Sequence, residues 1–238
     1  MQETWRRFKK NKLAMAGMYF LALLLVLSII TVIIDVATNR SIYNNYVIEQ
    51  DLVNRLKSPS LKNWLGTDEF GRDFFLRIIW GTRYSLFMGV FAIGFAMIFG
   101  GAIGAIAGFY GKLVDNTLMR IMDILLAMPP MLLALTVVAA LGTSLINVVI
   151  AVAISYIPTY ARVLRASVLT VKEKEYVESA RAVGASNMQI ILKFIIPNSL
   201  APIIVQGTLG VAGAILTIAS LSFVGLGVQP PLPEWGLM

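Results

Sequence analysis

The sequence alternates between long segments without Asp, Glu, Lys or Arg and shorter polar segments. The uncharged segments cover residues 13–34, 84–111, 124–161 and 194–233. A helix needs about 20 apolar residues to cross the hydrocarbon core of a bilayer. The first two segments suit one crossing each, and the third is long enough for two, with a turn signal at residues 141–144. The fourth holds one crossing and then a segment rich in Gly and Pro.

This pattern predicts an all-α polytopic membrane protein. We place five spans at about residues 13–34, 85–109, 121–141, 145–164 and 199–224. Composition agrees, because 58% of the residues are hydrophobic and 14% are charged, whereas soluble domains have about 45–50% and about 25%. The first apolar run is longer than the core of a signal peptide, and no small-x-small cleavage site follows it. We therefore expect it to be retained as a membrane anchor.

The distribution of basic residues predicts the orientation. The first twelve residues contain Arg6, Arg7, Lys9, Lys10 and Lys12. Cytoplasmic segments are enriched in Lys and Arg, so we expect a cytoplasmic N-terminus, with residues 35–83 outside and a loop at residues 165–197 inside. The outer segment also carries basic residues, but the rule weakens for long loops. We expect residues 1–83 to form an N-terminal cytoplasmic segment, first span and external segment, and residues 84–238 to form the core.

Glycine and proline mark two features within the spans. Three glycines, Gly100, Gly104 and Gly108, recur at four-residue spacing, which predicts a smooth helix face for close packing against another helix. Prolines within the later spans remove backbone donors at membrane depth. Such breaks suit a transport pathway, but Pro is also common in ordinary membrane helices, so both interpretations remain open.

Several classes of chemistry are disfavoured. The sequence has no Cys and no His, which argues against disulfides, thiolate nucleophiles and zinc sites. No charge lies mid-span, which disfavours an intramembrane enzyme or an ion-coupled carrier. We expect Asp123 to pair with Arg120, three residues earlier. No phosphate-binding loop of the form G-x-x-x-x-G-K-[ST] occurs, so we expect no ATP hydrolysis by this chain. We predict no catalytic, cofactor-binding or metal-binding residue.

The loop at residues 165–197 has an unusual degree of predicted order. Thr170–Glu173 has the form of a capping box, and helix-forming residues follow it. Gly184 is the expected stop of that helix. A second capping box at Ser186–Gln189 predicts another helix, which we expect Pro197 to end. The loop therefore reads as two short helices separated by a glycine turn.

The first of these helices has a candidate contact face. Tyr176, Ala180 and Val183 fall on one side at helical spacing. Ala180 and Gly184 are small, so a partner could approach closely. The charged residues Lys174, Glu175, Glu178 and Arg181 surround this face. The residues alone leave three interpretations open: a solvated linker, a helix on the lipid surface, or a docking site for another protein.

A motif in this loop resembles the EAA loop of bacterial ABC importer permeases. The spacing is met by Glu178-Ser179-Ala180, then Gly184, then Phe194, Ile196 and Pro197. Ser179, Phe194 and Ile196 depart from the consensus side chains. In that family the loop docks in a cleft of a cytoplasmic ATPase subunit. The resemblance implies the docking residues Tyr176, Glu178, Ser179, Ala180, Val183, Gly184 and Pro197.

Three more stretches resemble the dipeptide, oligopeptide and nickel subfamily, in particular its second, "C-type" permease. They are Trp5–Lys12, Leu65–Asp73 with its continuation to Ser85, and Ser222–Gly236. The resemblance implies a type I ABC importer fold and import of di- or oligopeptides across the bacterial cytoplasmic (inner) membrane. Nickel is the alternative substrate within the subfamily, and a secondary carrier is less favoured. The family pattern also leads us to expect a sixth span, which this sequence does not contain.

The resemblance also implies the other components of a complex. These are a second, homologous permease subunit, two cytoplasmic ATPase subunits and an extracytoplasmic peptide-binding protein, in addition to the lipid bilayer. ATP and Mg²⁺ would be used by the ATPase subunits, with no cofactor bound by this chain. No nucleic-acid partner is expected, because the net charge of +7 arises from residues that flank membrane segments.

Leu65–Asp73 contains an external motif, which we define as Asp68, Gly71, Arg72 and Asp73. Its charges alternate in sign around a turn at Gly71. One interpretation is an ion-paired cap over the entrance, and another is a docking surface for the binding protein. We favour structural ion pairing.

Overall fold

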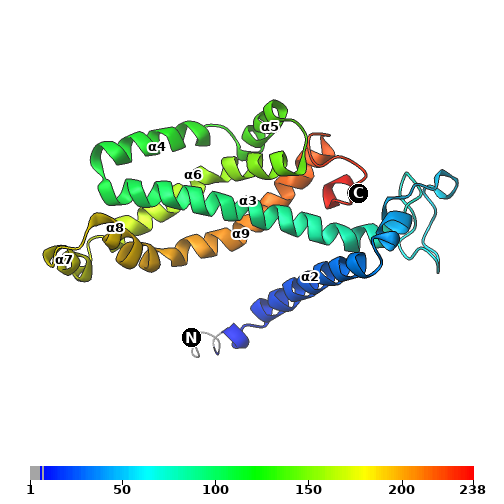
Figure 1. Ribbon diagram of the computed structural model, residues 1–238, viewed down its shortest axis with the longest axis horizontal. Helices are drawn as coiled ribbons and strands as arrows, with labels where there is room; N and C mark the ends of the chain where they lie inside the picture. The colour runs from blue at the N-terminus through cyan, green and yellow to red at the C-terminus, as the bar shows by residue number, and fades with distance from the viewer. Residues whose placement is uncertain (1–5, 7) are drawn as a thin grey trace. The chain divides into compact units, whose positions relative to one another are not determined.

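The computed structural model describes residue 6 and residues 8–238, and its regular structure is helical (Figure 1). The main helices are α2 (Lys12–Ala37), α3 (Phe74–Tyr110), α4 (Lys112–Leu126), α5 (Pro130–Leu141), α6 (Leu145–Val171), α7 (Glu175–Ala182), α8 (Asn187–Ile190) and α9 (Ile196–Phe223). Helices α2, α3, α6 and the continuous run Asn187–Phe223 are each long and apolar enough to cross a membrane. The pair α4–α5 would supply a fifth crossing. These helices confirm the all-α polytopic architecture.

The third predicted span differs from the expectation of one helix at residues 121–141. The chain forms α4 and α5 instead, bent by 88° at the break between them. Pro129 and Pro130 explain the break, because Pro lacks a backbone N–H and disfavours helical conformation in the residue before it. Pro129 is extended, with ψ of 136°, and Pro130 begins α5. Residues 112–120, which lie between the second and third predicted spans, belong to α4.

Two expected helix boundaries in the 165–197 loop were wrong. Thr170 does not open a helix, because α6 continues to Val171 and α7 begins only at Glu175. Burial of Val168 and Val171 extends α6 past the apparent capping signal. Pro197 does not end a helix either. It lies in the first turn of α9, and the helical run continues through it from Asn187 to Phe223. The π-helical turn Ile191–Ile195 joins α8 to α9.

The chain divides into two compact units. The N-terminal unit contains residues 1–86 and 230–238, and the core unit contains residues 87–229. Residues 230–238 thus join the N-terminal unit, whereas the sequence led us to place them in the core. The N-terminal unit includes the π helix Tyr43–Ile48 and the 3-10 helix Leu52–Asn54. A cluster of Tyr43, Val47 and Trp80 is buried at its centre.

Helix α6 is the central element of the core unit, where it contacts α4, α5 and α9. The three spaced glycines of α3 lie against it. A Cβ atom at Gly100 or Gly104 would collide with the α6 backbone at Ile157 or Ala161, and one at Gly108 would lie 2.9 Å from Val168 Cγ1. Only glycine allows this close approach. The four-residue spacing therefore lies at a helix–helix contact.

Candidate functional site

Helix α7 is a short helix with a well-defined end. The N–H of Ala185 donates to Ala180 O at 3.0 Å, and the N–H of Gly184 donates to Arg181 O at 2.9 Å. These two bonds form a Schellman motif, which satisfies carbonyls that a helix end leaves free. Gly184 has φ of +84°, in the left-handed region that favours glycine, and no other residue lies close to where its Cβ would be. The glycine is therefore required by the turn, and the space beside it is open.

Helix α7 has a buried side and an exposed side. Val177 and Ala180 are 0% and 6% exposed, whereas Tyr176 and Val183 are 41% and 86% exposed. Ala180 therefore does not share an exposed face with Tyr176 and Val183, as its spacing suggested. Ala180 lies three residues after Val177, on the same side of the helix. Both side chains are covered by other residues of this chain. The small side chain of Ala180 serves packing within the chain instead of approach by a partner.

The exposed side combines apolar and acidic side chains. Glu175, Glu178 and Ser179 are exposed on α7, and Ser179 Oγ donates to Glu175 O at 2.9 Å. The capping box at Ser186 and Gln189 is confirmed, and it begins α8. Large apolar side chains are exposed both before and after the turn at Gly184, namely those of Tyr176, Val183, Met188 and Leu192. Pro197 is exposed too, but it lies in α9. Such apolar exposure next to carboxylates is typical of an interaction surface.

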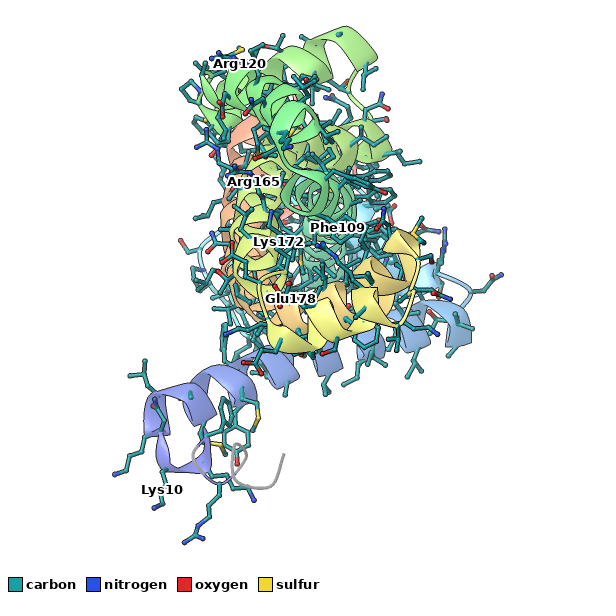
Figure 2. The ribbon with its side chains drawn as sticks, turned by 90° about the vertical axis from the view of Figure 1, so that its left-hand side faces the viewer. Lys10, Phe109, Arg120, Arg165, Lys172 and Glu178 are labelled. Carbon is teal, nitrogen blue, oxygen red and sulfur yellow. The ribbon has the colours of Figure 1, made fainter. Side chains whose placement is uncertain are left out.

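Two cationic side chains connect the α7 region to the end of α3. Lys172 Nζ donates to Gly108 O at 3.0 Å. The Arg181 guanidinium lies over the Phe109 ring, 5.6 Å from its centroid. Figure 2 views the molecule from the side on which α7 lies and labels Lys172, Phe109 and Glu178. Local sequence patterns do not predict either contact, because each joins residues more than 60 positions apart.

Two arginine–aspartate pairs join α6 to α4. Arg165 forms a bidentate pair with Asp115, with its Nη2 2.6 Å from Oδ2. Arg162 Nη2 lies 2.6 Å from Asp123 Oδ1. The expected pair between Asp123 and Arg120 is therefore wrong, since α6 supplies the arginine instead. Contact between α4 and α6 brings together residues 39 and 50 positions apart, which local spacing cannot reveal.

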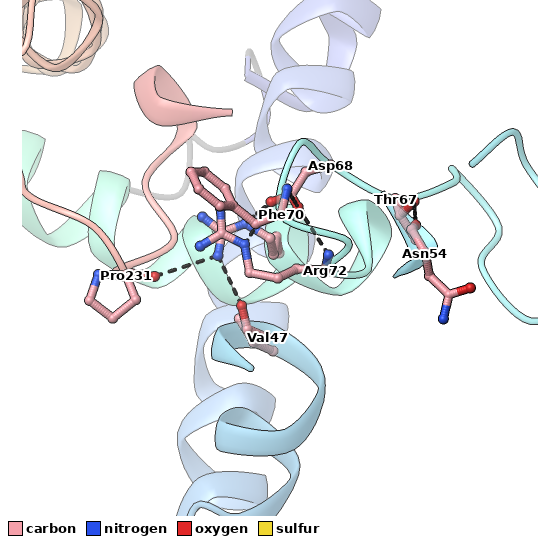
Figure 3. Close-up of polar contacts among 8 residues, drawn as sticks. Val47, Asn54, Thr67, Asp68, Phe70, Arg72 and Pro231 are labelled. Carbon is pink, nitrogen blue, oxygen red and sulfur yellow. Dashed lines mark hydrogen bonds and ion pairs between the residues drawn. The ribbon is translucent and has the colours of Figure 1, made fainter. Parts of the chain in front are cut away.

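The external motif forms a compact set of ion pairs in the N-terminal unit (Figure 3). Asp68 Oδ2 lies 2.7 Å from Arg72 Nε and 3.4 Å from Arg77 Nε. Asp68 Oδ1 also accepts from the backbone N–H groups of Phe70 and Arg72, both at 2.9 Å. Arg77 donates to Val47 O at 2.9 Å. Arg72 and Arg77 are buried, at 5% and 2% exposure. Their guanidinium groups therefore contact other residues of the N-terminal unit instead of solvent.

The other members of the motif shape the backbone around it. Asp73 Oδ1 accepts from the N–H of Leu76 at 2.8 Å, at the start of α3. Gly71 has φ of +76°, and a Cβ there would collide with the backbone of Asp51. Thr67 Oγ1 donates to Asn54 O at 2.5 Å. A cavity of about 960 Å³ lies beside this loop, and Arg72 and Asp73 are among its lining residues.

The N-terminal unit contains a second polar cluster, around Asp35, that was not predicted from the sequence. Asp35 is buried, and its carboxylate accepts from Trp80 Nε1 at 2.9 Å and from Arg83 Nη1 at 2.6 Å. Arg83 also donates to Tyr84 Oη at 3.1 Å. Burial, together with the hydrogen bond to Tyr84, raises the pKa of the Tyr43 hydroxyl. The sequence does place an acid, Asp35, directly after an apolar run. It does not reveal the partners of that acid, which lie 45 and 48 residues away along the chain.

The segment at residues 230–238 packs on the start of α3. The backbone N–H of Trp235 donates to Ser85 Oγ at 3.3 Å, and its Nε1 donates to Ile78 O at 3.2 Å. Glu234 is fully buried, and no hydrogen-bond partner for its carboxylate lies among the described residues. Burial of a carboxylate without a hydrogen-bond donor is costly. The contacts within the N-terminal unit do not explain why Glu234 is buried.

Comparisons with known proteins identify two family matches. The family described as "Binding-protein-dependent transport system inner membrane component" matches residues 100–238. The family described as "N-terminal TM domain of oligopeptide transport permease C" matches residues 1–59. Together these matches cover both ends of the chain.

Similar proteins extend over the whole chain. The dipeptide transport system permease protein DppC of Alkalihalophilus pseudofirmus is 45% identical over 237 residues, which cover 100% of this chain and 75% of the relative. The glutathione transport system permease protein GsiD of Pectobacterium atrosepticum is 42% identical over 243 residues, with 100% and 76% covered. Inward-facing structures of the MetNI methionine ABC transporter share the fold, with a TM-score of 0.56 and 20% identity. The match covers 64% of this chain and 76% of that one.

Proposed function

Because the chain belongs to the family of binding-protein-dependent transport system inner membrane components, we propose that it is a permease subunit of an ATP-driven importer of di- or oligopeptides. The names of the dipeptide and glutathione permeases that it resembles support the peptide substrate. The observation that carries the coupling role is the exposed side of α7, with its apolar and acidic side chains beside an open glycine turn.

In this proposal α7 is the coupling helix that docks on a cytoplasmic ATPase subunit. Tyr176, Glu178, Ser179 and Val183 contact the ATPase from the exposed side of the helix. Gly184 holds the turn that ends the helix and leaves room for the partner. Ala180 fixes α7 to its own chain, and Pro197 begins α9 behind it.

The remaining components follow from the coupling role. A second, homologous permease supplies the other half of the pathway, and two ATPase subunits bind ATP and Mg²⁺. An extracytoplasmic binding protein delivers the peptide. The basic N-terminal residues favour a cytoplasmic N-terminus in the bacterial inner membrane, and the same assignment places α7 on the cytoplasmic side.

Helix α6 is suited to carry movement from α7 into the membrane. Three residues separate its end from the start of α7, and it packs against the spaced glycines of α3. The pairs Arg165–Asp115 and Arg162–Asp123 join it to α4. ATP-driven movement of α7 would therefore displace several helices together.

The proposal is tested by co-expression of the chain with its candidate permease and ATPase partners, followed by purification. The purified material is reconstituted in lipid, and ATP hydrolysis is measured with and without a peptide-loaded binding protein. We expect ATPase subunits to co-purify and the loaded binding protein to raise hydrolysis. Purification of the chain without any ATPase, under conditions that preserve related importers, would overturn the proposal.

A further inference from the structure

We propose that Lys172 and Arg181 form a clamp that fastens the coupling helix α7 to the C-terminal end of α3. The clamp makes α3 a second route, beside α6, by which movement of α7 enters the membrane part. This inference rests on the proposed function for its role in transport, and its structural part stands on contacts within the core unit. Lys172 and Arg181 are positioning residues, since they act through α3 and α7.

The first contact lies at the last turn of α3. The last four carbonyls of a helix have no partner within the helix, and Gly108 O belongs to this turn. Lys172 Nζ supplies a donor at 3.0 Å. An ammonium group is also favourable at the negative end of the helix dipole. Lys172 directly follows the last residue of α6, so this single side chain connects the α6–α7 junction to α3.

The second contact involves the next residue of α3. Phe109 is buried, at 8% exposure, and the Arg181 guanidinium lies 5.6 Å from its ring centroid. This distance is within the range of a cation–π interaction. Arg181 lies in the last turn of α7, nine residues after Lys172. Contacts from before α7 and from its last turn therefore converge on two consecutive residues of α3.

The two contacts restrict how α7 can move. Its only covalent connection to α6 is the short segment 172–174, which by itself would allow α7 to pivot. Val177 and Ala180, between the two contacts, form the buried side of the helix. Gly108 also packs on Val168 of α6, so the end of α3 is held on two sides. A displacement of α7 is then shared by α3 and α6.

The functional test uses the complete importer in proteoliposomes and measures peptide taken up per ATP hydrolysed. The variants Lys172→Met and Arg181→Met keep the apolar stems but remove the charged groups. We expect each to lower the ratio, and the double variant to lower it about fivefold, the lower end of typical coupling between sites. Lys172→Arg should retain the ratio, because it keeps a donor for Gly108 O. Lys174→Met is the matched control, since this neighbouring lysine is exposed.

A spectroscopic measurement separates the clamp from a general loss of stability. The chain has no Cys, so nitroxide labels can be placed at Tyr110→Cys and Ser179→Cys, both of which are exposed. With the clamp intact we expect a narrow distance distribution between the labels, and a broad one in the Lys172→Met, Arg181→Met double variant. Equal widths in the two chains would overturn the clamp.

The outcomes distinguish the clamp from the proposed function. An unchanged ratio of peptide to ATP in the double variant would overturn the coupling role of the clamp while leaving the importer intact. If no ATPase subunit associates with the unaltered chain, the proposed function fails. The nitroxide distances in the full chain still decide in that case whether Lys172 and Arg181 hold α7 on α3.

Discussion

The external motif and the coupling helix are both short, charged segments, but they use their charges in opposite ways. In the external motif Asp68 forms ion pairs with two arginines and accepts hydrogen bonds from two backbone N–H groups. The two arginines are almost completely buried. On α7, Glu175 and Glu178 are exposed beside exposed apolar side chains. The buried charges of the external motif are paired within the chain, whereas the exposed charges of α7 lie beside apolar surface where a partner can reach them.

This comparison assigns the two motifs different roles. The contacts favour structural ion pairing for the external motif, as its alternating charges suggested. They favour docking for the exposed side of α7. Substitutions in the first region should therefore lower the stability of the chain, and substitutions in the second should lower transport while the chain remains folded.

Asp68→Ala should have the largest effect on stability. It leaves Arg72 and Arg77 buried without their shared carboxylate, and loss of one partner from a buried ion pair costs about 3–5 kcal/mol. Thermal unfolding of the purified chain in detergent measures the effect. Glu69→Ala is the control, because Glu69 is exposed in the same turn. An unchanged melting temperature for Asp68→Ala would remove the distinction between the two regions.

Asp35→Asn should destabilise the N-terminal unit by a smaller amount. The amide can still accept from Trp80 Nε1, but it loses the charge that Arg83 contacts at 2.6 Å. We expect a loss of about 2 kcal/mol, within the range for hydrogen bonds to charged groups. Thermal unfolding checks this value. Asp35→Ala should cost more, since it also removes the acceptor for Trp80, and equal losses in both variants would contradict this ordering.

Gly184→Ala should cost about 1–2 kcal/mol, because an L-residue must adopt left-handed backbone geometry there. The stability loss should be modest, since no other residue lies near the added Cβ. Peptide uptake should fall more than stability does, because the turn beside the docking surface is altered. Uptake per folded chain, compared with that of Ala182→Gly, measures this difference. Loss of stability without loss of uptake would make Gly184 a purely structural residue.

Glu178→Lys should change stability least, by less than about 0.5 kcal/mol, as is usual for an exposed position. We expect it to weaken ATPase binding and peptide uptake, because it reverses a charge on the exposed side of α7. Co-purification of ATPase subunits with the variant, relative to Glu173→Lys, measures the effect. Normal uptake by a well-folded Glu178→Lys chain would place the docking surface elsewhere.

Sequence patterns determined the membrane class, the approximate position of the spans and the motif on which the proposed coupling role of the 165–197 loop rests. Each of these depends on local information, because hydrophobic runs, turn residues and motif spacing act over a few positions. The glycine spacing at Gly100, Gly104 and Gly108 is local in the same sense, although it does not reveal which helix packs there. Gly184 was identifiable for the same reason, since glycine is the usual residue at a left-handed helix end.

Only the tertiary structure decided which distant residues meet and which faces are covered. Ala180 has the spacing of an exposed contact residue, yet it is buried against its own chain. Asp123 has an arginine three residues away, yet Arg162 of α6 pairs with it. Proline alone does not decide a break, because the helix bends by 88° at Pro129–Pro130, whereas Pro158 stays within the continuous helix α6. Local patterns state what a segment favours, whereas partners and burial depend on contacts between segments far apart in sequence.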